Sequence, residues 1–257
     1  MHRAERFGKH LAALAFAMFT AGASTSVHAT AVLVWSSGNV GSTAAVASWV
    51  QSLGGFTSVT GLDADTLTFA QLDAYDRVLY FSNTSSDSSN VARGDVLADF
   101  ADTGKRLVLA TFSWANQGGN TLAGRIISDA LSPFAVGGSS LYSNVSMSTN
   151  DASAFFAGVS SVSGLFHDDV TVVADATSRA SWSDGESLLA TKGNVVGVNL
   201  FPDDAFGNLG GDYRQLFVNA LGAQIDNGTV PEPASLALVG IAVAGLGLMR
   251  RKRRPAD

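Results

Sequence analysis

The sequence predicts an α/β fold: a flavodoxin-like, doubly wound, mostly parallel sheet to which a β-hairpin is added. Through the first half of the chain, short apolar runs of strand length alternate with segments in which apolar residues recur at helical spacing. Most of these runs are apolar without a break, which is typical of strands that helices cover on both faces. In the second half, strand-like runs and an Asp-Gly turn predict the hairpin.

The elements of the predicted parallel layer alternate regularly. The run AVLVWS is a buried strand, and the helix after it places Ala44, Ala47, Val50 and Leu53 on one face before a Gly-Gly stop. In chain order, we expect strands at 31–36, 56–59, 77–82 and 106–112, and helices at 43–53, 68–74 and 91–104. This alternation implies parallel pairing, with helices on both faces of the sheet.

After Pro133 the strands follow one another without long helices between them. We expect strands at 141–148 and 170–176, a hairpin over 179–192 that turns at Asp184-Gly185, a buried strand at 194–201 and a closing helix at 212–222. That helix packs Leu216, Phe217 and Leu221 against the sheet. Because the chain has no internal repeat and its Ser/Gly-rich stretches are only loop-sized, we predict one domain over 30–226.

Residues 1–29 have the layout of a secretory signal peptide. A basic start precedes an apolar run over Leu11–Ala23, and the small-residue sequence Val27-His28-Ala29 follows. The apolar run is short for ~30 Å of hydrocarbon at ~1.5 Å per residue, which argues against a retained membrane helix. We therefore predict a signal helix that directs export by the Sec route and is cleaved after Ala29.

The end of the chain, residues 227–257, has three parts. Pro231, Glu232 and Pro233 precede an apolar span over 234–249, which predicts a transmembrane helix of ~24 Å. The basic cluster after it consists of Arg250, Arg251, Lys252, Arg253 and Arg254. Such a cluster stays in the cytoplasm, so the body of the protein lies outside. A permanent single-pass anchor is the alternative interpretation of the tail.

These three parts together resemble the PEP-CTERM sorting signal and cover nearly all of that motif. The resemblance implies recognition by exosortase, an integral-membrane cysteine protease-transpeptidase that cuts near the Pro-Glu-Pro element. It also implies a Gram-negative host that makes extracellular polysaccharide and biofilm. The expected partners are exosortase, the inner membrane before processing, and extracellular polysaccharide; the expected final location is the cell surface or the medium.

The body resembles the class I glutamine amidotransferase-like superfamily, particularly its trehalose-utilisation-protein-like branch. The pieces that carry the resemblance are VLVWSSGNVGS, RVLYFS, ADTGKRLVLATF, AFFAGV and SLLATKGNVVGVNLF with YRQLFVNAL. They extend over most of residues 31–222 through patterns rather than invariant motifs. The resemblance implies the fold, and it identifies the turn after RLVLATF as the place where the family carries its nucleophile.

Composition excludes several functions. Between residues 30 and 229 there are eight basic and nineteen acidic residues, a balance of −11 against −6 for the whole chain. Phosphate backbones repel such a body, so we expect no nucleic-acid partner. The chain has no cysteine, which excludes disulfides, thiolate metal sites and a thiol nucleophile.

The catalytic residues of the resembled family are missing. The turn where the family has its cysteine reads Ala110-Thr111-Phe112-Ser113-Trp114, and no His-x-Glu pair follows later in the chain. Ser113 is a candidate substitute nucleophile with His167 as its base, oriented by Asp168 or Asp169. The G-x-S-x-G signature is absent, and a loop serine with a surface histidine is the alternative interpretation. Glutamine hydrolysis by the family mechanism is not expected.

Two binding sites are candidates. Ligands of doubly wound sheets bind at the carboxyl ends of the strands. Here those ends carry Ser36, Ser37, Asn39, Asn83, Ser113, Trp114 and Asn116. Trp114 either stacks on a sugar ring or packs beneath its loop. We expect no cofactor, with one candidate Ca²⁺ loop formed by Asp203, Asp204, Asn208 and Asp212, for which solvated turns are the alternative.

The predicted function is therefore that of an exported, exosortase-sorted surface or extracellular protein. Its body is expected to be a non-catalytic binding or matrix-associated module linked to exopolysaccharide and biofilm. The alternative is a carbohydrate-active enzyme or a serine hydrolase on the same fold. A carbohydrate-active enzyme would need two Asp side chains that face one cleft.

Overall fold

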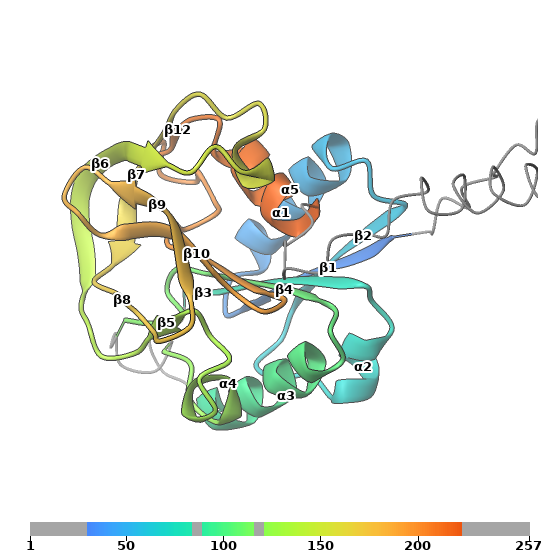
Figure 1. Ribbon diagram of the computed structural model, residues 1–257. Coiled ribbons are helices and arrows are strands. Elements are labelled where there is room, and N and C mark those ends of the chain that lie inside the picture. Colours follow the sequence, from blue (N-terminus) through green and yellow to red (C-terminus); the bar gives the residue numbers. More distant parts are fainter. Residues whose placement is uncertain (1–29, 84–88, 116–120, 223–257) are drawn as a thin grey trace, which may run out of the picture.

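The computed structural model describes residues 30–83, 89–115 and 121–222 (Figure 1). These residues form a central β-sheet between two layers of helices. Figure 1 shows the two layers on opposite sides of the sheet. The predicted signal helix at 1–29 and the predicted transmembrane helix at 234–249 lie outside the described residues. None of the helices that the structure describes is long and apolar enough to cross a membrane.

One half of the sheet is parallel. Its strands are β1 (Ala31–Ser37), β2 (Ser58–Asp63), β3 (Arg77–Ser82), β4 (Arg106–Ala110) and β11 (Val195–Val198). They lie in the order β2-β1-β3-β4-β11, and every neighbouring pair is parallel. This is the strand order of a flavodoxin-like sheet, so the predicted parallel layer is confirmed.

The other half of the sheet is antiparallel. From β11 outward it contains β10 (Ser187–Lys192), β9 (Thr177–Trp182), β6 (Ser140–Asn150), β7 (Val162–Asp168) and β12 (Gly210–Gly211). The predicted hairpin is β9–β10, and its turn includes Gly185 at a φ of 101°, a conformation that glycine adopts without strain. The sheet is therefore mixed, and its antiparallel part is larger than the single hairpin that the sequence predicts.

Several strands differ from the prediction. Strand β2 lies at Ser58–Asp63 rather than at 56–59, and the two-residue strand β12 is not predicted. Strand β7 is not predicted because the run SVSGLFHD mixes polar and apolar residues without regular alternation. The strand predicted at 170–176 is reduced to β8 (Thr171–Val172), which pairs with β5 (Phe134–Ala135) in a separate ribbon. A short 3-10 helix, η1 (Ala154–Phe156), precedes β7.

Helices α1 (Val40–Leu53) and α5 (Tyr213–Gly222) cover one face of the sheet (Figure 1). Helix α1 begins three residues before its predicted start because Asn39 caps it. The Asn39 side chain accepts a hydrogen bond from the N–H of Ser42 at 3.2 Å. Helix α5 begins one residue later than predicted, and its packing face is buried as expected.

Helices α2 (Phe69–Asp73), α3 (Asn90–Asp102) and α4 (Arg125–Ser128) cover the opposite face (Figure 1). A capping box between Thr68 and Gln71 starts α2. Helix α3 lies within two residues of its prediction. The single turn of α4 is too short to give a helical pattern in the sequence.

The core has two apolar layers, one on each face of the sheet. Val32 and Val34 of β1 belong to the layer beneath α1 and α5, whereas Leu33 and Trp35 belong to the layer beneath α2, α3 and α4. All four side chains are fully buried. Burial on both faces explains why β1 is apolar at every position from Ala31 to Trp35 rather than at alternate ones.

Candidate functional site

The carboxyl end of β1 is closed by hydrogen bonds within the protein. The Ser36 hydroxyl contacts Thr43 and donates to the Asp63 carboxylate at 3.0 Å. The backbone N–H of Asn39 donates to the same Asp63 oxygen at 3.0 Å. Ser36 and Asn39, both predicted to face a ligand, thus build the connection between β1 and α1.

The neighbouring strand ends are similar. The hydroxyls of Ser37 and Ser82 bond to each other at 2.9 Å, and both side chains are fully buried. Asn83 is exposed, and Asn116 lies outside the described residues. Trp114 is fully buried: its indole N–H donates to Ser132 at 3.0 Å. Of the two interpretations of Trp114, its surroundings favour packing beneath the loop.

Ser113 and His167 have separate partners. The Ser113 hydroxyl is fully buried and donates to the carbonyl of Ala110 at 2.6 Å, inside its own turn. The buried ring of His167 bonds through Nε2 to the carboxylate of Asp184 at 2.8 Å. Among the described residues, no hydrogen bond joins Ser113 to His167, and the histidine is not at the surface.

The carboxylate of Asp168, the last residue of β7, contacts the turn after β4, which holds Ser113 and Trp114. One carboxylate oxygen accepts the backbone N–H of Trp114 at 3.3 Å and the other accepts the Ser140 hydroxyl at 3.1 Å. Burial raises the pKa of Asp168 to about 7, although hydrogen bonds from Trp114, Ser140 and Ala115 oppose the shift. Backbone N–H groups at such a turn stabilise an oxyanion in acyl-transfer enzymes. Here they face a carboxylate of the protein itself.

Asn199 holds this region together. Its side-chain oxygen accepts the Thr111 hydroxyl at 3.0 Å and the backbone N–H of Asp168 at 2.7 Å. Its amide nitrogen donates to the carbonyls of Asp168 at 2.7 Å and Ser187 at 3.1 Å. The amide therefore has a partner for each of its donors and acceptors. The sequence gives no sign of this role, because the partners are far apart in the chain: Thr111 directly follows β4, Asp168 ends β7 and Ser187 begins β10.

The acidic residues of the candidate Ca²⁺ loop do not converge. Asp212 accepts the backbone N–H groups of Ser160 at 2.7 Å and Ser161 at 3.2 Å, and these bonds lower its pKa. Asp204 accepts the N–H of Leu209 at 2.9 Å. Within the part of the chain that the structure describes, no three His, Cys, Asp or Glu side chains are grouped so that they could hold a metal ion.

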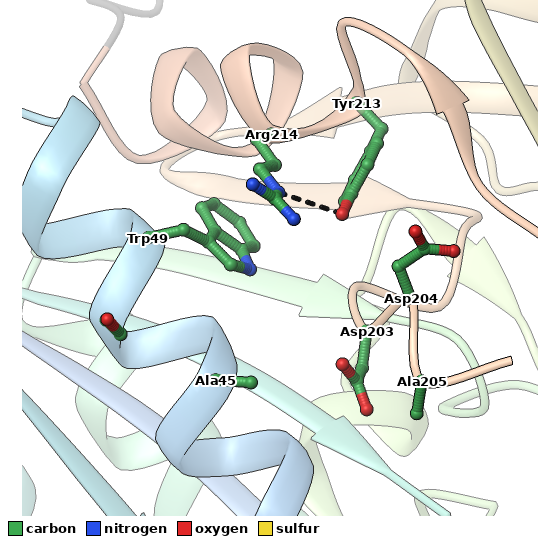
Figure 2. Close-up of a pocket in the computed structure, with 8 residues that line it drawn as sticks. Ala45, Trp49, Asp203, Asp204, Ala205, Tyr213 and Arg214 are labelled. Atoms are coloured by element: carbon green, nitrogen blue, oxygen red, sulfur yellow. Dashed lines mark hydrogen bonds between the residues drawn. The ribbon is translucent and has the colours of Figure 1, made fainter. Parts of the chain in front are cut away.

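Asp203 and Asp204 instead form one wall of an open hollow of about 410 Å³ beside α1 (Figure 2). The lining comes from α1, from the loop after β11 and from the start of α5. It consists of Ala45, Ser48, Trp49, Asp203, Asp204, Ala205, Tyr213 and Arg214. Figure 2 shows α1 on one side of the hollow and the two aspartates on the other, with Tyr213 above the aspartates and Arg214 between Trp49 and Tyr213.

Hydrogen bonds to neighbouring residues hold the polar side chains of the hollow in place. Arg214 Nε donates to the Tyr213 hydroxyl at 2.9 Å, and the guanidinium lies 5.4 Å from the centre of the tyrosine ring. The Ser42 hydroxyl donates to one oxygen of Asp203. Burial raises the pKa of Tyr213, and the negative charges of Asp204 and Asp203 add to the shift.

Comparison with known proteins identifies the tail. Residues 229–254 match the family model described as the PEP-CTERM protein-sorting motif. The chain therefore carries this motif, as the sequence predicts, and the motif implies export with a membrane-anchored sorting signal. No curated protein matches the chain significantly in sequence.

Solved structures resemble the body. A ThuA-like protein from Bacteroides uniformis ATCC 8492 matches with a TM-score of 0.50 and 15% identity, over 74% of this chain and 89% of that one. Cytoplasmic Protein STM1381 from Salmonella typhimurium LT2 matches with a TM-score of 0.54 and 12% identity, over 74% of this chain and 98% of that one. At such identities the likeness concerns the fold alone, and it confirms the predicted resemblance at that level.

Proposed function

We propose that this chain is exported, released by exosortase, and serves as a non-catalytic binding module of the extracellular matrix, linked to its polysaccharide. The observation that carries the proposal is the turn after β4. There the backbone N–H of Trp114 binds Asp168, and the Ser113 hydroxyl binds its own turn. The site at which this fold would perform acyl transfer is filled by the protein's own groups.

A hydrolase needs an accessible nucleophile within about 2.6–3.2 Å of its base. Ser113 is fully buried, and His167 bonds to Asp184 instead. The raised pKa of Asp168 is not evidence of a general acid here, because the side chain is fully buried and both of its oxygens accept hydrogen bonds. A buried, hydrogen-bonded carboxyl group of this kind supports a structural role.

The route to the outside follows from the two ends of the chain. We place a signal peptide at 1–29, cleaved after Ala29 in Sec-dependent export, the module at 30–226 and the sorting signal at 227–257. The tail anchors the protein in the inner membrane of a Gram-negative cell until exosortase cuts near the Pro-Glu-Pro element. The −11 balance of residues 30–229 suits a soluble product outside the cell.

Intact-mass analysis tests the proposal in the native host, with and without exosortase. The expected product lacks residues 1–29 and the tail, fractionates with the extracellular matrix, and appears only when exosortase is present. The purified product is also incubated with glutamine, with simple esters and with the host's polysaccharide. A product of turnover that the Ser113→Ala variant no longer makes would overturn the non-catalytic assignment.

A further inference from the structure

The hollow beside α1 combines an apolar wall with charged groups of both signs. Ala45 and Trp49 on α1 face the carboxylates of Asp203 and Asp204, and Arg214 stands between the two walls (Figure 2). Its volume of about 410 Å³ lies within the range of roughly 300–1,000 Å³ that is usual for ligand sites. Neither the sorting motif nor the fold assigns a function to this surface.

The charged groups of the hollow keep bonding capacity for a ligand. Asp203 uses one oxygen for Ser42, and Asp204 uses one for the N–H of Leu209. Each carboxylate has a second oxygen. Arg214 Nε donates a hydrogen bond to the Tyr213 hydroxyl. Arg214 takes part in none of the ion pairs between described residues. The hollow thus presents acceptors on one wall and guanidinium donors beside them.

This combination excludes several classes of ligand. A purely apolar molecule would desolvate three charged groups without compensating them. A cation would meet Arg214, and an anion would meet both aspartates within a region whose charge balance is −11. A metal ion lacks a third ligand of the required kind among the described residues.

A neutral hydroxylated ring can bind both the charged groups and the apolar wall of the hollow. A hydroxyl group donates to a carboxylate and accepts from a guanidinium, so adjacent hydroxyls can bind Asp204 and Arg214 together. The apolar face of such a ring fits against Trp49 and Ala45. Ser48, Ala205 and Arg214 are exposed at the rim, so one unit of a longer chain can enter while its neighbours stay in solvent.

We propose that this hollow binds one unit of an uncharged saccharide chain and that it rejects saccharides that carry carboxylates. The inference rests on the proposed function, since it names the ligand class of the binding module and the place where that ligand binds. The hollow shares no lining residue with the polar cluster of Ser36, Asn39 and Trp114, where the sequence predicts a ligand.

Titration calorimetry on the full-length protein, in a detergent without a sugar headgroup, tests the inference. The probes are neutral gluco-, manno- and galacto-oligosaccharides, and oligo-uronates of equal length. We expect at least one neutral series to bind and the uronates to fail. Preferred binding of uronates, or binding of free amino acids without any neutral saccharide, would overturn the ligand class.

Matched variants test the location. Ser48→Trp fills the hollow from α1 and should weaken binding at least about tenfold. Ala44→Trp adds the same side chain to an exposed position of α1 that does not line the hollow, and it should leave the affinity unchanged. Asp204→Asn keeps the oxygen that accepts from Leu209 and should weaken binding about tenfold, because one charge-assisted hydrogen bond is lost.

The outcomes separate this inference from the proposed function. If a neutral saccharide binds and the two tryptophan variants bind equally, the hollow is not the site, although the module still binds sugar. If the released protein fractionates with the matrix and binds none of the neutral probes, only the inference fails. The proposed function itself fails in two other experiments: if the purified product turns over a substrate, or if intact-mass analysis finds an uncut tail in the membrane fraction.

Discussion

The carboxyl edge of the parallel strands and the hollow beside α1 both contain polar side chains, and they use them in opposite ways. At the edge, Ser36, Ser113 and Asp168 are fully buried and bond to other groups of the protein. In the hollow, Asp203 and Asp204 line an open surface, and each accepts a hydrogen bond from the protein on one of its two carboxylate oxygens. A polar residue at a place where the fold usually binds ligands is therefore weak evidence of a site. Its hydrogen-bond partners decide the matter.

The largest expected effect comes from opening the closed edge at Asn199. Asn199→Ala leaves the hydroxyl of Thr111, the N–H and C=O of Asp168, and the C=O of Ser187 without their partner inside the protein. We expect the free energy of unfolding to fall by about 4 kcal/mol, because buried polar groups without partners cost about 1–3 kcal/mol each. Urea denaturation measures it as a lower midpoint.

Asn144→Ala is the control, because Asn144 is exposed on β6. It should change the stability by no more than about 0.5 kcal/mol. Equal midpoints for the two variants would contradict the view that the edge is held by this network.

The second expected effect is a dependence of stability on pH, which comes from Asp168 at the closed edge. The pKa of Asp168 rises from 3.8 to about 7 on folding, so the folded state binds more protons than the unfolded state between these values. Stability should therefore fall as the pH rises from 4 to 7, and it should level off above 7. Asp168→Asn stays neutral and still presents an oxygen to the N–H of Trp114. It should be more stable than the wild type by about 4 kcal/mol at pH 8 and equal to it below pH 4.

Asp169→Asn is the matched control at the exposed neighbouring position. Thermal unfolding at several pH values should show the wild-type profile for Asp169→Asn and a flatter one for Asp168→Asn. If the stability of all three proteins depends on pH in the same way, folding does not raise the pKa of Asp168, and this part of the account is wrong.

The third effect is smaller. Ser113→Ala removes a hydroxyl whose observed bond is to the carbonyl of Ala110 in its own turn. We expect a loss of about 1 kcal/mol in the free energy of unfolding and unchanged saccharide binding. Denaturation and titration calorimetry of the same sample measure both. A loss of binding with unchanged stability would make the edge, rather than the hollow, the functional surface.

The smallest effect on stability is expected in the hollow. Ser48→Trp and Ala44→Trp both change exposed positions of α1, so each should shift the stability by no more than about 0.5 kcal/mol. The two variants should differ in binding alone. A large loss of stability in Ser48→Trp would mean that Ser48 contributes to the packing of α1, and Asp204→Asn would then provide the test of the site.

The parallel half of the fold was predictable because burial on both faces leaves an apolar run that is visible in the sequence itself. The antiparallel half was less so. Strand β7 alternates irregularly between buried and partly exposed residues, and its place in the sheet depends on pairing with β6 and β12. Local patterns carry no information about such pairing.

The candidate sites show the same limit. The sequence identifies Asp203 and Asp204 as a polar cluster, but it cannot show that Trp49 and Arg214 lie across from them, since those residues come from α1 and α5. For Trp114 it offers two interpretations, and only the contact with Ser132 distinguishes between them. Side chains that meet through tertiary packing cannot be paired from one sequence.

Hydrogen exchange of the full-length protein, with and without a neutral oligosaccharide that binds it, tests the central claim most directly. If the edge is closed and the hollow is the site, added protection should be confined to α1 and to residues 203–214 around the hollow. Added protection at residues 110–115, without any at α1, would contradict the account. The ligand would then bind where the fold usually binds its ligands.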